Sequence, residues 1–396
     1  MISQRNRLKA ISENVLQIEI SAIKEMAILS AQVKDAVSLA WGLPSFQTPD
    51  YIRETVKQQL DLDRDIGKYT LPDGLKEFRE QVAQRHQQET GVSVDADKNI
   101  MITAGNMEGL NILFHSILDP GDEVILTDPC FASHIQQIKL CGGQAIYWPL
   151  DEEKGWQVDL TLLPNLINHR TKAIVMVSPS NPTGKIFSKE NLIKIGQLAR
   201  DHGLLVIIDD PYSQFIYENN NHYFNLATVE EFSDHVIYLF TFSKCFAMSG
   251  WRLGYMILPE ELKQQVLKVQ DANIICAPRI SQVAGMAALS QPPVHFEAFR
   301  NILSKRRELI CQRLDNLPHV FEYVKPDGAY YVFPKILTEH SSSHDFAIQL
   351  LKQIKVTLTP GAAFGPSGEH HVRMAYCVSN DVINQAFDRM DKYFVP

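Results

Sequence analysis

The residues best suited to covalent chemistry lie in the segment 241–254, which follows a strand-like apolar run. Lys244 stands there among small and apolar side chains, with the hydroxyl of Thr241 before it and the guanidinium of Arg252 after it. Burial disfavours the charged form of a lysine, and a neutral amine can bond covalently to a carbonyl. Because a guanidinium matches an oxyanion, the segment predicts a lysine that binds a phosphorylated aldehyde. The alternative is a strand-end lysine that extends its ammonium to solvent.

Short apolar runs alternate with helical stretches from residue 100 onward. Most of these runs are continuous rather than alternating, which is typical of strands buried on both faces of a mainly parallel sheet. The expected fold class is therefore α/β, a large domain with a mainly parallel sheet flanked by helices. The runs cover residues 100–103, 123–126, 173–177, 204–208, 236–240 and 255–258, with helices expected near 106–118 and 189–202.

Most of these expected strands end in a polar or aromatic group. Gly105 lies at a strand-to-helix junction, where backbone N–H groups can bind phosphate. Phe131, Asn181 and the pair Asp209 and Tyr212 follow three other strands. Each residue taken singly has a structural explanation, such as a core phenylalanine or a loop amide. Active sites of such sheets form where strands end and helices begin, so the shared position indicates one site.

The pattern loosens into helices after residue 260, and a second, smaller α+β domain is expected beyond it. Arg373 lies in an alternating strand of that part, where an arginine is more often a surface charge. Gly42 lies in an earlier loop with two prolines, and is either a plain turn or a place where a ligand approaches the backbone. Tyr69 lies in another Gly/Pro loop, where a surface anchor is the usual reading.

Composition and charge exclude several function classes. The 396 residues carry a net charge of −8, which disfavours nucleic acid as the main partner. The six cysteines form no Cys-x-x-Cys pair, so we expect no metal site and a reducing compartment. No Gly-x-Gly-x-x-Gly or Walker sequence occurs, which disfavours nicotinamide and ATP sites. We find neither a signal-peptide core nor a bilayer-spanning run, and we expect a cytoplasmic protein with no membrane partner.

Three motifs stand in a fixed order, namely Asn181-Pro182-Thr183-Gly184, Asp209-x-x-Tyr212 and the segment 241–254. Together they resemble the class I/II pyridoxal-phosphate-dependent aminotransferases, which have the fold type I, aspartate aminotransferase-like architecture. The resemblance runs from about residue 41 to the C-terminus. It implies pyridoxal 5'-phosphate as the cofactor, and Lys244 as the lysine that binds it and moves the proton at the substrate Cα.

The resemblance also divides the chain and assigns the cofactor contacts. It implies a large pyridoxal-phosphate-binding domain over 46–294 and a small α+β domain from 1–45 and 295–396. Asp209 would pair with the ring nitrogen and keep the ring an electron sink. The other ring contacts would be two hydrogen-bond donors to the phenolic oxygen and one stacked aromatic: Tyr212, Asn181 and Phe131. The phosphate would be held by Gly105, Asn106, Thr241 and Arg252.

Substrate and partner residues follow from the same resemblance. Arg373 would bind the substrate α-carboxylate as a bidentate pair, with Gly42 and Asn181 beside it. Tyr69 would reach the partner's phosphate across a homodimer interface. One aspartate-specific branch carries a lysine where this chain has Met107, and a methionine suits a neutral or aromatic side chain better. Another cation, for example from the partner subunit, would still allow aspartate.

The implied function is the ping-pong transfer of an amino group from an L-amino acid to a 2-oxo acid, with 2-oxoglutarate as the expected acceptor. The first alternative is a β-elimination lyase on the same scaffold, since a fold does not fix a reaction. The second is a ligand-sensing module built on an aminotransferase-like domain. The intact Lys244 and Asp209 favour catalysis over sensing.

Overall fold

An eight-stranded sheet forms the centre of the chain and positions most of the residues discussed above. The computed structural model describes residues 10–217 and 223–395. The strand order is β2-β9-β8-β7-β6-β3-β4-β5. The strands are β2 (Ile100–Thr103), β3 (Glu123–Asp128), β4 (Gln144–Asp151), β5 (Gln157–Val158), β6 (Thr171–Val177), β7 (Leu205–Asp210), β8 (Val236–Thr241) and β9 (Gly254–Ile257).

The sheet is mostly parallel. The adjacent strands β8, β7, β6, β3 and β4 all run in one direction. Only β9, between β8 and β2, and β5, beside β4, run against their neighbours. Every residue of β3 and β8 is buried, which is consistent with the uninterrupted apolar stretches inside these strands. The predicted α/β class, with a mainly parallel sheet flanked by helices, is confirmed.

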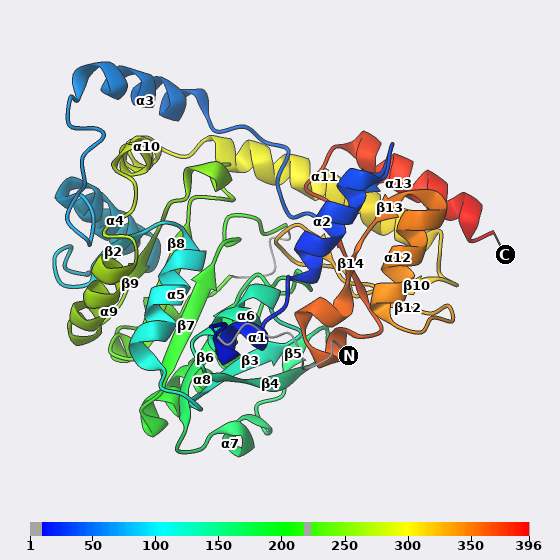
Figure 1. Cartoon of the computed structure of the whole chain (residues 1–396), viewed down its shortest axis with the longest axis horizontal. Helices are drawn as coiled ribbons and strands as arrows, with labels where there is room; N and C mark the ends of the chain where they lie inside the picture. The colour runs from blue at the N-terminus through cyan, green and yellow to red at the C-terminus, as the bar shows by residue number, and fades with distance from the viewer. Residues whose placement is uncertain (1–9, 218–222, 396) are drawn as a thin grey trace.

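The two faces of the sheet pack against different helices (Figure 1). Successive strand residues point to opposite faces. Met176 of β6 belongs to the core that includes α8 (Lys189–His202), whereas Val175 belongs to the core under α5 (Asn106–Ile117) and α6 (Ala132–Leu140). The sheet is therefore buried on both sides, and its strand ends are the places where polar side chains can meet a ligand.

Local signals in the sequence explain where the helices begin and end. Ser188 caps α8, because its side chain accepts a hydrogen bond from the Asn191 N–H at 3.2 Å. Gly203 ends the same helix with φ +67°, a conformation that glycine adopts without steric cost. The remaining sheet-side helices are α3 (Asp50–Leu62), α4 (Lys76–Thr90), α7 (Leu163–Leu166), α9 (Glu260–Asn273) and α10 (Arg279–Leu289).

The chain after α11 (His295–Asp315), the long yellow helix of Figure 1, forms most of a second unit. The segment before Gly42 joins this unit, because β1 (Val37–Ser38) pairs in parallel with β13 (Val356–Thr357). Its other elements are α2 (Ala22–Gln32), α12 (Ser343–Ile354), α13 (Asn380–Tyr393), β10 (Phe321–Glu322), β11 (Tyr331–Val332), β12 (Lys335–Ile336), β14 (Thr359–Pro360) and β15 (Val372–Ala375).

The first helix lies on the sheet unit rather than on the second unit. α1 (Glu13–Leu16) packs against α6, and Asn14 Nδ2 donates to the Leu140 carbonyl at 3.2 Å. The division into 46–294 and 1–45 with 295–396 stays a prediction. No helix in the described ranges has the length and apolar composition that a bilayer-crossing segment needs.

Candidate active site

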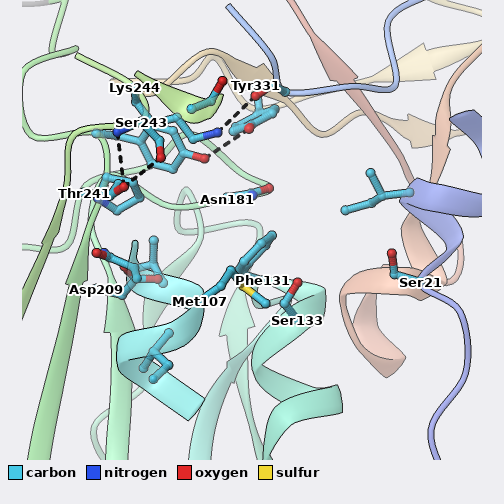
Figure 2. Close-up of a pocket in the computed structure, with 18 of the residues that line it drawn as sticks. Ser21, Met107, Phe131, Ser133, Asn181, Asp209, Thr241, Ser243, Lys244 and Tyr331 are labelled. Atoms are coloured by element: carbon cyan, nitrogen blue, oxygen red, sulfur yellow. Dashed lines mark hydrogen bonds between the residues drawn. The ribbon is translucent and has the colours of Figure 1, made fainter. Parts of the chain in front are cut away.

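A cavity of about 260 Å³ lies at the carboxyl ends of the parallel strands, between the sheet and the second unit. Figure 2 shows Lys244 and Tyr331 on one side of it and Met107 and Phe131 on the other. Most of the residues predicted from the sequence line this cavity, although they come from distant parts of the chain. They are Gly42, Asn106, Phe131, Asn181, Asp209, Tyr212, Thr241, Lys244, Arg252 and Arg373.

Lys244 lies just beyond the end of β8, and its side chain points into the cavity (Figure 2). Its Nζ donates to the Gly42 carbonyl at 3.2 Å. Burial lowers the pKa of Lys244 to about 8, and the nearby cations Arg373 and Arg252 act in the same direction. A substantial fraction of this amine is therefore neutral near pH 7 to 8, as a nucleophile toward an aldehyde must be.

Asp209, near the end of β7, is a buried carboxylate that is 5% exposed. It accepts hydrogen bonds from Asn106 Nδ2 at 2.6 Å and from His134 Nε2 at 3.1 Å. Within the described ranges no lysine or arginine pairs with it. These two contacts fix the carboxylate at the cavity wall, where it can hold a protonated ring nitrogen.

The start of α5 and the Lys244 segment together form a cluster of anion-binding groups. Gly105 precedes α5 with φ +82°, and a Cβ at this position would lie 2.6 Å from Arg252 Nη2. Only a glycine allows the guanidinium to approach the start of the helix this closely. Thr241 Oγ1 and Ser243 Oγ lie 2.9 Å apart beside them. Helix-start N–H groups, two hydroxyls and one guanidinium are donors that fit a phosphate group.

Tyr212 and Asn181 present donors to the same cavity. The Tyr212 hydroxyl lies 3.0 Å from the Tyr331 hydroxyl. Burial raises the pKa of the Tyr212 phenol, so this side chain remains a protonated hydrogen-bond donor. Asn181 Oδ1 accepts from Arg373 Nη1 at 3.1 Å, which leaves its amide nitrogen for another acceptor. Phe131 lies just beyond β3 and contributes an aromatic face to the cavity wall. These groups fit a flat ring that carries a phenolic oxygen.

Arg373 of β15 is a buried cation without a carboxylate partner in the described part of the chain. Its side chain is 1% exposed and lies 4.5 Å from the centroid of the Tyr331 ring. Its Nη2 donates to the Ala40 carbonyl, whereas its Nε has no hydrogen-bond partner. A buried guanidinium is costly unless an anion completes its shell. The alternative of a surface charge therefore does not hold, and the side chain suits a substrate carboxylate, which is the role that the resemblance implies.

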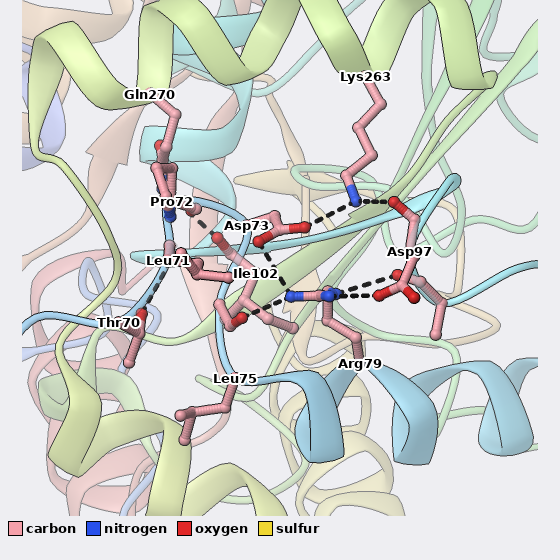
Figure 3. A network of polar contacts seen from close by, with 12 residues as sticks. Thr70, Leu71, Pro72, Asp73, Leu75, Arg79, Asp97, Ile102, Lys263 and Gln270 are labelled. Carbon is pink, nitrogen blue, oxygen red and sulfur yellow. Dashed lines mark hydrogen bonds and ion pairs between the residues drawn. The ribbon is translucent and has the colours of Figure 1, made fainter.

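Two predicted residues do not line the cavity: Gly105, which precedes α5, and Tyr69, whose side chain is 75% exposed. The loop that carries it is nevertheless held firmly at its C-terminal side (Figure 3). Asp73 pairs with Arg79 at 2.9 Å and with Lys263 at 3.0 Å, and Arg79 also pairs with Asp97. The two basic side chains are buried, so this network fixes the backbone next to Tyr69.

Several residues in or behind the cavity wall were not singled out from the sequence. His134 reaches Asp209 from α6, and Tyr331 faces Tyr212 from β11. A histidine on a helix and a tyrosine in a strand carry no local signal of a site. The N-terminal residues Ser21, Ile23 and Lys24 also line the cavity. Their pattern predicts only a helix, and their position depends on how that helix packs.

Comparisons with known proteins agree with this geometry. The family described as aminotransferase class I and II matches residues 34–390. An aspartate aminotransferase of Pyrococcus abyssi is 33% identical, over 97% of this chain and 98% of the relative. An aromatic-amino-acid aminotransferase 2 of Thermococcus litoralis is 31% identical, over 97% of this chain and 98% of the relative.

A solved structure shares the fold. The aspartate aminotransferase of Thermus thermophilus with maleate superposes with a TM-score of 0.91 at 30% identity, and the match covers 97% of this chain and 100% of that chain. The expected fold type I architecture and the expected enzyme class are both confirmed. The chain belongs to the class I and II aminotransferases, and it is a transaminase that uses pyridoxal phosphate.

Proposed function

We propose that this enzyme moves the amino group of a neutral or aromatic L-amino acid to 2-oxoglutarate by a ping-pong mechanism. The observation that carries the proposal is that two groups line one cavity: a buried Arg373, which has no carboxylate partner among the described residues, and a lysine of lowered pKa, Lys244. The two groups are also linked through backbone, because Arg373 donates to the Ala40 carbonyl and Lys244 to the Gly42 carbonyl. One small substrate can therefore reach both side chains.

The proposed roles of the protein groups follow from their chemistry. When bound, pyridoxal phosphate supplies an aldehyde that carries the amino group and a ring that accepts electrons from the substrate Cα. Lys244 would hold the cofactor covalently in the resting enzyme and, during transfer, would move the proton from the substrate Cα to the cofactor's aldehyde carbon. Asp209 keeps the ring nitrogen protonated by its negative charge, and His134 and Asn106 hold that carboxylate in place. Arg373 orients the substrate carboxylate.

The remaining cofactor contacts are proposed from the donor groups around the cavity. Gly105, Asn106, Thr241 and Arg252 hold the phosphate, so Lys244 can release the cofactor's carbon without losing the cofactor. Three further groups hold the ring, through stacking and hydrogen bonds to the phenolic oxygen: Phe131, Asn181 and Tyr212.

The preference for a neutral or aromatic donor rests on the apolar part of the cavity. Met107 is 39% exposed at the start of α5, and Ile23 and Leu110 line the same space. A methionine adapts its shape to a large apolar group at little cost. Relatives of this chain carry the names of aspartate and of aromatic-amino-acid aminotransferases, so both donor classes belong in the test.

A homodimer and a cytoplasmic location complete the proposal. The side chains of Tyr69 and Leu62 are each 75% exposed, and that of Leu71 is 69% exposed. A group of exposed large side chains favours a protein interface. In such a dimer Tyr69 would contact the partner's phosphate.

All six cysteines are free and buried, which supports a reducing compartment.

The test is a screen of amino donors against 2-oxoglutarate, with formation of glutamate as the readout. We expect aromatic and neutral donors to be used faster than aspartate. Release of ammonia and pyruvate without glutamate formation would instead identify a β-elimination lyase. Cofactor binding with turnover of no donor would contradict the proposal and favour a ligand-sensing role.

A further inference from the structure

The cavity wall carries more positive charge than the roles above use. The described residues that line it include four basic side chains, Lys24, Lys244, Arg252 and Arg373, and one carboxylate, Asp209. Three of the basic groups are assigned to the aldehyde, the phosphate and the α-carboxylate. Lys24 has no assigned role. A cation beside a binding cavity is a candidate contact for a further anionic group of the ligand.

Lys24 lies in the first turn of α2, at the edge of the cavity. The Lys24 backbone N–H donates to Ser21 Oγ at 3.4 Å, which caps the helix at this end. Its Nζ lies 5.3 Å from the centroid of the Trp41 ring. Figure 2 shows Ser21 on the side of the cavity away from Thr241. The helix start therefore forms the wall that faces a substrate side chain rather than the cofactor phosphate.

Three consecutive residues, 40 to 42, connect this lysine with Arg373 and Lys244. The carbonyl of Ala40 accepts from Arg373, the ring of Trp41 lies beside the α2 lysine, and the carbonyl of Gly42 accepts from Lys244. Consecutive Cα atoms are only about 3.8 Å apart. A substrate with its carboxylate on Arg373 and its amino group at Lys244 would thus extend its side chain toward the ammonium of the α2 lysine.

The ammonium of Lys24 is available for such a contact. It forms no ion pair with any residue of the described ranges, whereas the adjacent Glu25 pairs with His344 at 3.3 Å. An exposed contact with an aromatic ring is weak and leaves the N–H donors of the ammonium free. The neighbouring Ile23 and Met107 are apolar, so one space offers both a cation and an apolar surface.

We propose that Lys24 is the residue that selects dicarboxylic substrates, by binding the distal carboxylate of 2-oxoglutarate and of glutamate. Neutral and aromatic side chains occupy the same space against Ile23 and Met107 and leave Lys24 in solvent. A single cavity then accepts both partners of the reaction without a cation at position 107. This assignment rests on the proposed amino-group transfer, and it names the residue that recognises the 2-oxo acid acceptor of that reaction.

The kinetic test compares Lys24→Met with Lys24→Arg and with Lys34→Met, a control for an exposed lysine outside the cavity wall. For Lys24→Met we expect kcat/KM for 2-oxoglutarate to fall about tenfold, and kcat/KM for phenylpyruvate to change less than about twofold. Lys24→Arg should retain most of the 2-oxoglutarate activity, and Lys34→Met all of it. Equal losses with both oxo acids, or no loss with 2-oxoglutarate, would overturn the proposal.

A binding measurement tests the same residue without turnover. Calorimetry on the holoenzyme should show that glutarate binds more tightly than butyrate, and that Lys24→Met removes this difference. The wild-type preference for glutarate should also weaken as salt is added. A preference that persists in Lys24→Met, or is missing from the wild type, would overturn the role of Lys24. Failure of the wild type to transfer amino groups would contradict only the proposed function, because glutarate binding still decides the role of Lys24.

Discussion

The lowered pKa of Lys244 leads to a quantitative prediction about its reactivity. A lysine of ordinary pKa 10.5 is about 0.03% neutral at pH 7, whereas a pKa of about 8 makes about 9% of the amine neutral. The neutral fraction thus rises about 300-fold. Because the pKa is lowered, the amine loses its proton at lower pH, and the rate of covalent cofactor capture should rise with pH and reach half its maximum near 8.

The assay is the rate at which apoenzyme captures pyridoxal phosphate between pH 6 and pH 10.5, followed by absorbance. The same reaction with Nα-acetyl-lysine corrects for titration of the cofactor itself. Arg373→Leu removes one of the neighbouring cations that lower the pKa, so its midpoint should move to higher pH. A midpoint near 10 in the wild type would refute the argument that burial deprotonates Lys244.

Three further substitutions test the other parts of the site. Asp209→Asn should retain the cofactor by absorbance but lower kcat by roughly 10²- to 10³-fold, since the ring nitrogen loses its counter-charge; wild-type kcat would remove Asp209 from its role. Arg373→Lys should lower kcat/KM for amino and oxo acids about tenfold or more, because a lysine cannot form the bidentate pair; unchanged kinetics would contradict carboxylate binding there. Gly105→Ala should lower the free energy of unfolding by about 1–3 kcal/mol and weaken cofactor binding, because the position has φ +82° and a Cβ would lie 2.6 Å from Arg252. Denaturant unfolding measures the first effect and cofactor titration the second. Wild-type values in both would refute the close approach of Arg252 to this glycine.

Much of the central sheet was predictable because its strands are buried on both faces. The run 100–103 is β2 without change, and the run 236–240 lacks one residue of β8. By contrast, β4 (Gln144–Asp151) was missed. It contains Pro149 and mixes exposed with buried residues, because β3 pairs with it on one side, whereas on its other side β5 pairs with only its last two residues, Leu150 and Asp151. A strand that has no neighbour along most of one side lacks the continuous apolar pattern that identified the other strands.

Some residues of the site could likewise be predicted from local sequence, whereas others depend on contacts between distant parts of the chain. Lys244, Asp209 and Asn181 stand at strand ends within recognisable motifs, so their meeting at one cavity follows from the topology of a parallel sheet. Arg373 and Lys24 come from opposite ends of the chain, and only packing of the second unit brings them to the cavity. The burial of Arg373, and hence its value as a carboxylate site, could not be deduced from an alternating strand.

The covalent role of Lys244 is the central claim, and reduction of the holoenzyme with borohydride tests it most directly. Reduction makes the bond between lysine and cofactor permanent, and mass spectrometry of the peptides then locates it. We predict that the pyridoxyl phosphate group is found on Lys244, and that Lys244→Ala carries no such group and has almost no turnover. A modified lysine elsewhere in the chain, or full turnover in Lys244→Ala, would contradict the account.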